Sequence, residues 1–228
     1  GEYTIQEILE RIVNNGKVNF DYKELMDVKG ISMLDEKGKI LSRKEREPIK
    51  NLDELVDVDL DLIKHMEKRW TAIPVSRGRG CSHRCEFCSV NRQYKASSPE
   101  KALRQIIKYS EKGYRDFFIT DDNFAQNVRE AIKLCKMIGD YRKKSKKKIE
   151  LTVQVRSEVA ENDRLIDAMR YAGVRTLAIG YESPINEELK AMNKGVTVEE
   201  YIERGRKLSK YFIQIGMLYQ SGSNGILI

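Results

Sequence analysis

The sequence predicts an α/β fold in which a parallel sheet curls into a barrel or an open barrel. From Ala72 onward, short apolar strands alternate with amphipathic helices, the strands are rich in branched and aromatic residues, and the connections are short. Strands and helices that alternate in this way build parallel sheets through right-handed crossovers. The predicted strands are 73–76, 116–120, 149–155, 176–180 and 212–219.

A helix is expected near the amino terminus. Thr4 and Glu7 have the spacing of a capping box, and the apolar residues that follow recur at helical intervals. The Asn-Gly pair at 15–16 is the expected end of this helix, because glycine favours the left-handed backbone found there.

A hairpin and a linker are expected to follow. Residues 30–34 and 39–41 flank a turn that contains Gly38, which is typical of a β-hairpin. Residues 44–69 are highly charged and are interpreted as a linker. The chain is therefore expected to consist of a helix-and-hairpin segment over 1–43, a linker over 44–69 and a main domain over 70–228.

Helices are predicted in the connections between the strands of the main domain. Their start and stop signals are Ser98-Pro99, Asn127, Asn162, the capping box of Thr197 and Glu200, and the glycines Gly113 and Gly173. In parallel sheets of this kind, functional residues gather at the carboxyl ends of the strands. Loops that follow the predicted strands are therefore the place to look for a site.

Composition limits the class of function. Hydrophobic residues make up 40% and charged residues 34% of the 228, which is typical of an ordered globular protein. No apolar run has the length of a membrane span, and the amino terminus lacks a signal-peptide core, so a cytoplasmic location is predicted. The net charge of +7 permits anionic partners without requiring them. Much of it lies in residues 142–148, at the expected end of the sheet opposite the site, and is interpreted as a solvated run.

Three of the four cysteines lie in the loop after the first predicted barrel strand. Cys81, Cys85 and Cys88 have the spacing CxxxCxxC, which is too tight for ordinary paired disulfides. Thiolates suit iron–sulfur clusters and zinc, and a compact loop can bring three of them around one cuboidal cluster without a fourth. A closed zinc site would have to recruit His83 or Cys135, but Cys135 lies on the apolar stripe of a helix and is interpreted as structural.

The residues from 81 to 90, CSHRCEFCSV, with Phe87 before the last cysteine, resemble the signature loop of the radical S-adenosylmethionine (SAM) superfamily. Three later segments are similar to that family in the expected order: FFITDDNFAQN, VQVRSE and LAIGYESPINEELKAMNKG. With RGRGC, they most resemble the subgroup that carries an amino-terminal cobalamin (B12)-binding domain, which includes methyltransferases and an anaerobic cyclase. The resemblance implies a partial (β/α)6 TIM-like barrel, truncated at its carboxyl end, with residues 1–43 as the tail of a cobalamin domain.

The resemblance also implies an enzyme that cleaves SAM reductively to a 5'-deoxyadenosyl radical. Cys81, Cys85 and Cys88 would hold a [4Fe-4S] cluster whose open iron binds SAM, while no catalytic side chain is assigned. The implied SAM contacts are Phe87 at the adenine, Asp121 and Asp122 at the amino group, and Arg156 and Glu182 at the carboxylate and the ribose or amine. A reductant such as flavodoxin or ferredoxin and a small-molecule substrate, rather than nucleic acid, are the implied partners.

Several alternatives remain open from the sequence. Asp121 and Asp122 can be turn and cap residues, and Arg156 can pair with Glu182. Cobalamin would need a domain absent from this chain, since His65 lies in the wrong context to bind cobalt. The rival functions are a methylthiotransferase-like radical SAM enzyme, which normally has more cysteines, and a non-catalytic zinc or iron–sulfur binding module.

Overall fold

A computed structural model describes the chain except for residues 15–16, 19–21, 36, 66–69 and 219–228. The chain divides into two compact units, Gly1–Lys50 and Asn51–Ile228, at a point inside the predicted linker. Within the described ranges, no helix combines the length and the apolar character needed to cross a membrane.

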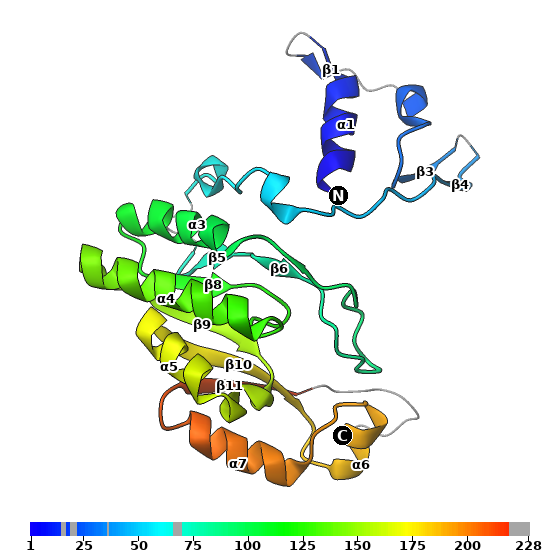
Figure 1. The fold of residues 1–228 in the computed structure, drawn as a ribbon. Helices are drawn as coiled ribbons and strands as arrows, with labels where there is room; N and C mark the ends of the chain where they lie inside the picture. Colours follow the sequence, from blue (N-terminus) through cyan, green and yellow to red (C-terminus); the bar gives the residue numbers. More distant parts are fainter. Residues whose placement is uncertain (15–16, 19–21, 36, 66–69, 219–228) are drawn as a thin grey trace. The chain divides into compact units, whose positions relative to one another are not determined.

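The second unit is built on a five-stranded parallel sheet (Figure 1). In spatial order its strands are β11 (Ile213–Leu218), β10 (Val174–Glu182), β9 (Glu150–Val155), β8 (Asp116–Ile119) and β5 (Ile73–Val75). The predicted α/β fold with a parallel sheet is confirmed, and each predicted strand is present, although residue 219 lies outside the described residues. Because all five strands are parallel, their carboxyl ends lie along one edge of the sheet.

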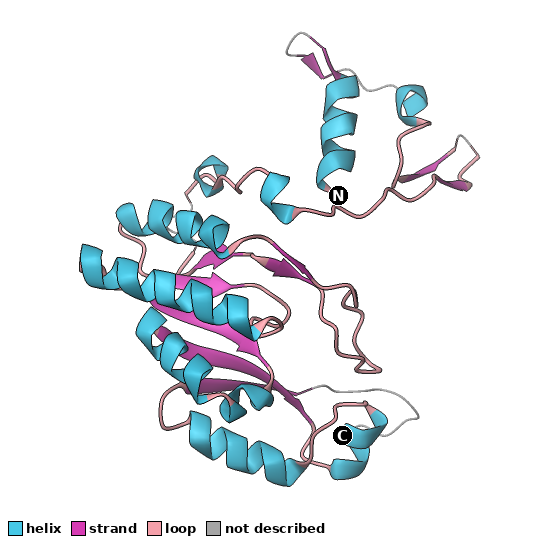
Figure 2. Ribbon diagram, viewed as in Figure 1, coloured by secondary structure: helices cyan, strands magenta, loops and turns pink. Residues whose placement is uncertain are grey.

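Figure 2 shows helices lying over one face of the sheet: α3 (Pro99–Glu111), α4 (Val128–Ser145), α5 (Asp163–Ala172) and α7 (Val198–Leu208). The predicted caps are found at Asn127 and Asn162, whose side chains accept hydrogen bonds from first-turn backbone N–H groups. Thr197 and Glu200 form the predicted capping box. Gly173 ends α5 with a φ of +87°, which explains the glycine at that stop.

The hydrophobic core lies between the sheet and these helices. Along β9, Val153 is fully buried in the core while its neighbour Gln154 is only half-buried, as expected when alternate side chains face opposite sides of a sheet. Cys135 of α4 is also fully buried, and burial raises the pKa of its thiol to about 12. The interpretation of Cys135 as a structural residue is confirmed.

Several short elements have no counterpart in the predicted ones. They are the hairpin of β6 (Gly78–Arg79) and β7 (Lys95–Ala96), the 3-10 helices η2 (Leu52–Glu54), η3 (Leu60–Leu62) and η4 (Ser157–Glu161), and helix α6 (Asn186–Ala191). Elements of two to six residues are too short for hydrophobic periodicity to reveal. The β6–β7 hairpin matters most, because it frames the cysteine loop.

An acidic segment before β5 is fastened to α3 by ion pairs. Asp57, Asp59 and Asp61 alternate with apolar residues and pair with basic side chains along α3 and at its C-cap, among them Lys101, which is 3.8 Å from Asp57. Lys101 is buried and also donates a hydrogen bond to the carbonyl oxygen of Leu52 at 2.9 Å. These contacts hold the chain that leads into the first strand of the sheet.

The first unit contains α1 (Glu2–Ile12), η1 (Tyr22–Leu25) and two short hairpins, β1 (Val13–Asn14) with β2 (Lys17–Val18), and β3 (Ser32–Leu34) with β4 (Ile40–Ser42). The hairpin predicted from residues 30–41 is confirmed, and Gly38 has the positive φ that its turn requires.

The predicted capping box at Thr4 is wrong. Helix α1 begins at Glu2 with Gly1 as the N-cap residue, so Thr4 and Glu7 lie inside the helix. The side chains of Thr4 and Glu7 instead bind Arg46, which donates to the Thr4 hydroxyl at 3.2 Å and pairs with the Glu7 carboxylate. The predicted end of this helix at residues 15–16 lies outside the described residues.

Two glycines inside helices should respond to alanine in opposite directions. A Cβ at Gly139 of α4 would overlap the ring of Tyr171 in α5, whereas a Cβ at Gly205 of α7 would make an ordinary contact, 3.4 Å from the Tyr181 hydroxyl. We expect Gly139→Ala to lower the free energy of unfolding by about 1–3 kcal/mol through overpacking. Gly205→Ala should raise it by about 0.5–1 kcal/mol, because alanine is the better helix former. Urea unfolding measures both, and equal stability of the two variants would contradict this packing.

Candidate functional site

The cysteine loop lies between β6 and β7 and is closed at its root. The backbone N–H of Cys81 donates to the carbonyl oxygen of Asn91 at 2.9 Å. Gly80 has a φ of +85°, and a Cβ there would lie 2.6 Å from the carbonyl oxygens of Asn91 and Gln93. Only glycine tolerates both the positive φ and the close approach of these carbonyl oxygens. The loop geometry therefore explains the glycine directly before Cys81.

Two adjacent carboxylates that follow β8 hold the first residues of this hairpin. Asp121 Oδ1 accepts hydrogen bonds from the backbone N–H groups of Arg77 at 2.7 Å and Gly78 at 2.8 Å. Asp122 Oδ2 accepts one from the N–H of Gly80 at 2.8 Å. The side chains of Asp121 and Asp122 therefore bind three backbone N–H groups between residues 77 and 80. These bonds position the start of the cysteine loop relative to the sheet.

Asp121 is enclosed by the protein. Its side chain is fully buried, its Oδ2 lacks a hydrogen-bond partner, and the Arg77 Nε lies 3.9 Å away. Burial raises the pKa of the Asp121 carboxyl, although the two backbone N–H groups and the Arg77 guanidinium act to lower it. Asp121 therefore holds the backbone at the start of the cysteine loop through buried hydrogen bonds.

The three thiols of the loop face one cavity of about 200 Å³ at the carboxyl ends of the strands. Other predicted site residues also line it, namely Phe87, Asp122, Arg156 and Glu182, whereas Asp121 does not. The remaining lining residues include His83, Gln154, Gly180, Lys194 and Met217. The structure therefore brings together residues from the cysteine loop and from the ends of four strands.

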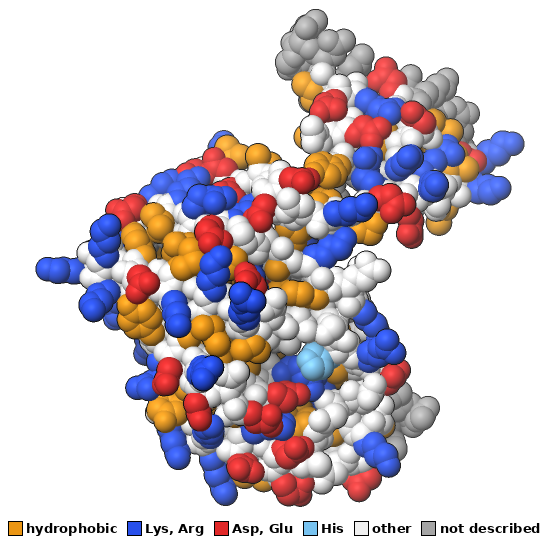
Figure 3. All heavy atoms as spheres, viewed as in Figure 1, with side chains coloured by type: hydrophobic (Ala, Val, Ile, Leu, Met, Phe, Trp, Pro, Cys, Tyr) orange, Lys and Arg blue, Asp and Glu red, His pale blue; other side chains and the backbone are white. Residues whose placement is uncertain are grey.

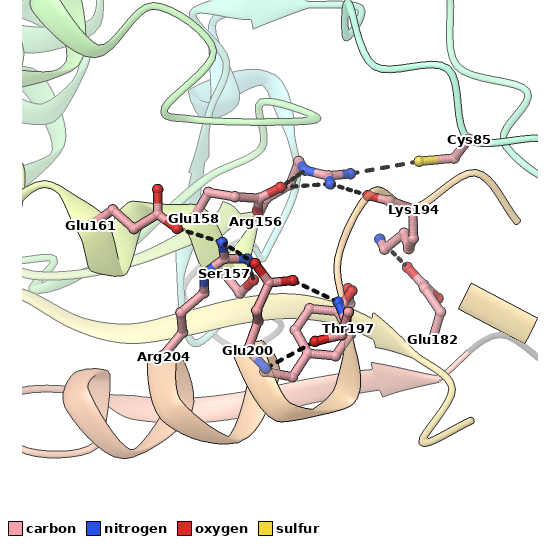
Figure 4. Close-up of polar contacts among 12 residues, drawn as sticks. Cys85, Arg156, Ser157, Glu158, Glu161, Glu182, Lys194, Thr197, Glu200 and Arg204 are labelled. Atoms are coloured by element: carbon pink, nitrogen blue, oxygen red, sulfur yellow. Dashed lines mark hydrogen bonds and ion pairs between the residues drawn. The ribbon is translucent and has the colours of Figure 1, made fainter. Parts of the chain in front are cut away.

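Arg156 connects this cavity to a cysteine sulfur (Figure 4). Its Nη1 donates to Cys85 Sγ at 3.6 Å, and its Nη2 donates to the carbonyl oxygen of Lys194 at 2.6 Å. Nε and Nη2 both donate to Glu158 Oε1, at 2.9 and 2.6 Å. Each nitrogen of the guanidinium therefore has a protein acceptor.

Glu182 pairs with Lys194, and both side chains are nearly buried, with Nζ and Oε1 3.1 Å apart (Figure 4). The alternative that Arg156 pairs with Glu182 is wrong. Glu182 has a φ of +66°, which is unusual outside glycine, and a Cβ at Gly180 would overlap its carboxylate. The Lys194 ammonium also lies 5.8 Å from the centroid of the Phe87 ring. The positive φ of Glu182 and the absence of a side chain at Gly180 together accommodate one buried ion pair beside the cavity.

The thiols of the cavity are soft donors of the kind that suit iron–sulfur clusters and zinc. Among the residues that the structure describes, no three or more His, Cys, Asp or Glu side chains are arranged to hold one metal ion. A structural zinc site normally takes four protein ligands, whereas three cysteine thiols line this cavity. Three free thiols around one cavity, with the fourth buried in the core, match a cuboidal cluster with one iron open.

The charge around the thiols also fits. Burial raises the pKa of the Cys81 thiol, while the backbone N–H of His83 and the Arg156 guanidinium act to lower it. A bound metal replaces the proton of each thiol, and nearby cations then offset the negative charge of the thiolates. Arg156 and Lys194 supply that positive charge in this cavity.

The family model of the radical SAM superfamily matches residues 75–224, which include the last residue of β5, the other four strands of the sheet and the whole cysteine loop. The chain belongs to the radical SAM superfamily. The resemblance that the sequence showed is thereby confirmed.

The matched relatives of this radical SAM chain are longer than it is. An uncharacterised methyltransferase of Pyrococcus horikoshii is 26% identical over 219 residues, which are 92% of this chain and 45% of the relative. The hopanoid C-2 methylase of Rhodopseudomonas palustris is 25% identical over 185 residues, 77% of this chain and 35% of that protein. The chain therefore spans less than half the length of these curated relatives.

A solved structure shows the same fold. It is the cobalamin-dependent S-adenosylmethionine radical enzyme OxsB with aqua-cobalamin and S-adenosylmethionine bound, with a TM-score of 0.74 and 23% identity over 95% of this chain and 32% of that one. At this identity the likeness establishes the architecture alone.

The turn after α6 was not predicted as part of the site, yet it closes over the cysteine loop. The backbone N–H of Glu86 donates to the carbonyl oxygen of Met192 at 3.0 Å, and Asn193 Nδ2 donates to the carbonyl oxygen of Arg84 at 2.8 Å. Asn193 has a φ of +52°, typical of a turn after a helix. The Asn-Lys-Gly sequence at 193–195 was the available signal for such a turn, but nothing local shows that it meets residues more than 100 positions earlier.

The basic run at 142–148 lies at the end of α4 and before β9, away from the carboxyl ends of the strands. Lys147 pairs with Glu111 at 3.1 Å and Lys148 with Glu150 at 3.0 Å. Acidic and basic side chains are interspersed on the face shown in Figure 3. These pairs agree with the interpretation of the run as solvated surface charge.

The closure of the loop can be tested through Cys85, which is buried. We expect Gly80→Ala to push the Asn91–Gln93 backbone away and expose the Cys85 thiol, so that alkylation at this residue becomes at least about tenfold faster in the metal-free protein, equivalent to about 1.4 kcal/mol of lost protection. Residue-resolved mass spectrometry measures the rate. Gly38→Ala is the matched control, because Gly38 also has a positive φ but no atom lies within 4 Å of its added Cβ. An unchanged Cys85 rate in Gly80→Ala would contradict the role of Gly80.

Proposed function

We propose that this chain binds a [4Fe-4S] cluster through Cys81, Cys85 and Cys88 and takes part in the reductive cleavage of SAM. The observation that carries the proposal is that these three free thiols, and no fourth, line one cavity at the carboxyl ends of the strands of a radical SAM fold. Held by these residues, the cluster would supply an electron, received from an external reductant, for the cleavage of the SAM sulfonium to methionine and a 5'-deoxyadenosyl radical.

Three residues that line the cavity are the proposed SAM contacts. Phe87 would lie against the adenine, Asp122 would accept from the amino group, and Glu182 would contact the ribose or the amine. Carboxylates suit an ammonium or a hydroxyl, and the buried position of Glu182 strengthens such a bond. The enclosed lining also limits access of water to reactive species.

The predicted SAM contacts of Asp121 and Arg156 stay predictions, and the contacts in this structure favour other roles. Asp121 does not line the cavity, and its Oδ1 is engaged by two loop amides. The guanidinium of Arg156 is engaged by Glu158, Lys194 and Cys85. We propose that Asp121 supports the loop.

We further propose that the radical chemistry serves a cobalamin-linked methyl transfer or cyclisation of a small molecule. Support comes from the two methyltransferase relatives and from the cobalamin-dependent enzyme with the same fold. Residues 1–43 as the tail of a cobalamin-binding domain, a flavodoxin or ferredoxin as the reductant, and a cytoplasm that keeps the thiols reduced belong to the same proposal.

Iron binding tests the proposal directly. After anaerobic reconstitution with iron and sulfide we expect about four irons per chain and a brown charge-transfer absorption, and addition of SAM and a reductant should yield 5'-deoxyadenosine. Cys85→Ala should lose most of the iron, while Cys135→Ala should keep it, because Cys135 lies in the hydrophobic core. One tightly bound zinc per chain without SAM cleavage would favour the non-catalytic binding module instead.

A further inference from the structure

Arg156 reaches the cysteine loop from another part of the sheet. It follows the last residue of β9, and its Nη1 donates to the sulfur of Cys85 at 3.6 Å, across 71 positions of sequence. Cys85 is buried, and the Arg156 side chain is 14% exposed, so the contact is largely screened from water. A cation therefore donates a hydrogen bond to a proposed ligand sulfur in a region of low dielectric constant.

Other groups fix the orientation of this guanidinium. Glu158, at the start of η4, accepts from Nε and Nη2, and the carbonyl oxygen of Lys194 accepts a further bond from Nη2. The other two guanidinium nitrogens are thus held by acceptors other than Cys85, and Nη1 points toward the sulfur (Figure 4). Because these bonds already orient the guanidinium, Nη1 needs no reorganisation when the charge at the sulfur changes.

We propose that Arg156 is a positioning residue that orients the Cys85 sulfur and raises the reduction potential of the cluster. This inference rests on the proposed function, since it assumes that Cys85 is a cluster ligand. Hydrogen bonds to the sulfurs and nearby positive charge set the potential of iron–sulfur clusters. A one-electron reduction adds negative charge, so the N–H donor and the charge of Arg156 stabilise the reduced form more than the oxidised form.

The same contact assigns Arg156 a role different from the SAM carboxylate contact that the sequence resemblance implies. A contact with the SAM carboxylate alone would leave the potential of the SAM-free cluster unchanged when lysine, which keeps the positive charge, replaces Arg156. A bond to the ligand sulfur would change that potential before any SAM is added. Redox titration in the absence of SAM therefore separates the two roles.

The test uses the 228-residue chain, reconstituted anaerobically, with the iron content measured first. We then expect Arg156→Met, at a fixed potential, to show a reduced-to-oxidised ratio about tenfold lower than wild type by EPR-monitored titration, equal to a midpoint about 59 mV more negative. Arg156→Lys should fall between the two, because lysine keeps the charge but loses the braced, planar fork. These shifts are read without SAM and without turnover.

Arg204 provides the matched control. It is a similarly buried arginine in the same region that donates to Ser157 Oγ at 3.4 Å and pairs with Glu161 and Glu200 (Figure 4). Within the described residues, none of its hydrogen bonds or ion pairs is with a cysteine. We expect Arg204→Met to keep the wild-type potential. If Arg204→Met shifts the potential as far as Arg156→Met does, the effect is general to the charge network and the proposal is overturned.

The remaining outcomes are also decisive. A wild-type potential in iron-loaded Arg156→Met overturns the proposal. If that variant fails to hold iron, the Lys variant decides, since an unshifted or more positive midpoint there contradicts the loss of the N–H···S bond. A wild-type chain that binds no four-iron cluster would instead refute the proposed function, and that result is known before any variant is titrated.

Discussion

The anchoring of the cysteine loop by Asp121 and Asp122 is the constraint on which the rest of the site depends. A loop without regular structure loses conformational entropy when it is ordered, roughly 1–2 kcal/mol per residue for the backbone alone. Carboxylates at the end of β8 offset part of that cost with bonds to three amides, and Gly80 allows the two ends of the loop to meet. The sheet, which is held by the hydrophobic core, thereby sets where the thiols lie.

Charge in the cavity is arranged around those thiols. Arg156 and Lys194 come from the ends of different elements, and each is held by its own carboxylate, Glu158 or Glu182. A buried cation without such a partner would carry a large desolvation cost, so the paired arrangement makes two cations tolerable beside the cavity. Lys194 links the two ion pairs. Its carbonyl oxygen accepts a hydrogen bond from Arg156, and its ammonium binds Glu182. Disturbing the turn after α6 would therefore affect both at once.

Sequence alone predicted the parts of the structure that local rules control. Branched strands, capping residues such as Asn162 and stop glycines such as Gly173 gave the main α/β elements, and the CxxxCxxC spacing gave the thiols of the cavity. The capping box at Thr4 was wrong because α1 begins at Glu2, so Thr4 and Glu7 lie inside the helix, where both side chains bind Arg46. The contact between Arg156 and Cys85 could not be predicted, since it depends on how strands and loops 71 positions apart meet in the fold.

The central claim is that three thiols of this chain hold a four-iron cluster with one iron open to SAM. Mössbauer spectroscopy of the chain reconstituted with ⁵⁷Fe, before and after SAM is added, tests it most directly. We expect the spectrum of a [4Fe-4S] cluster in which one of the four iron sites changes when SAM binds. A spectrum that SAM leaves unaltered, or iron that is not in a four-iron cluster, would contradict it.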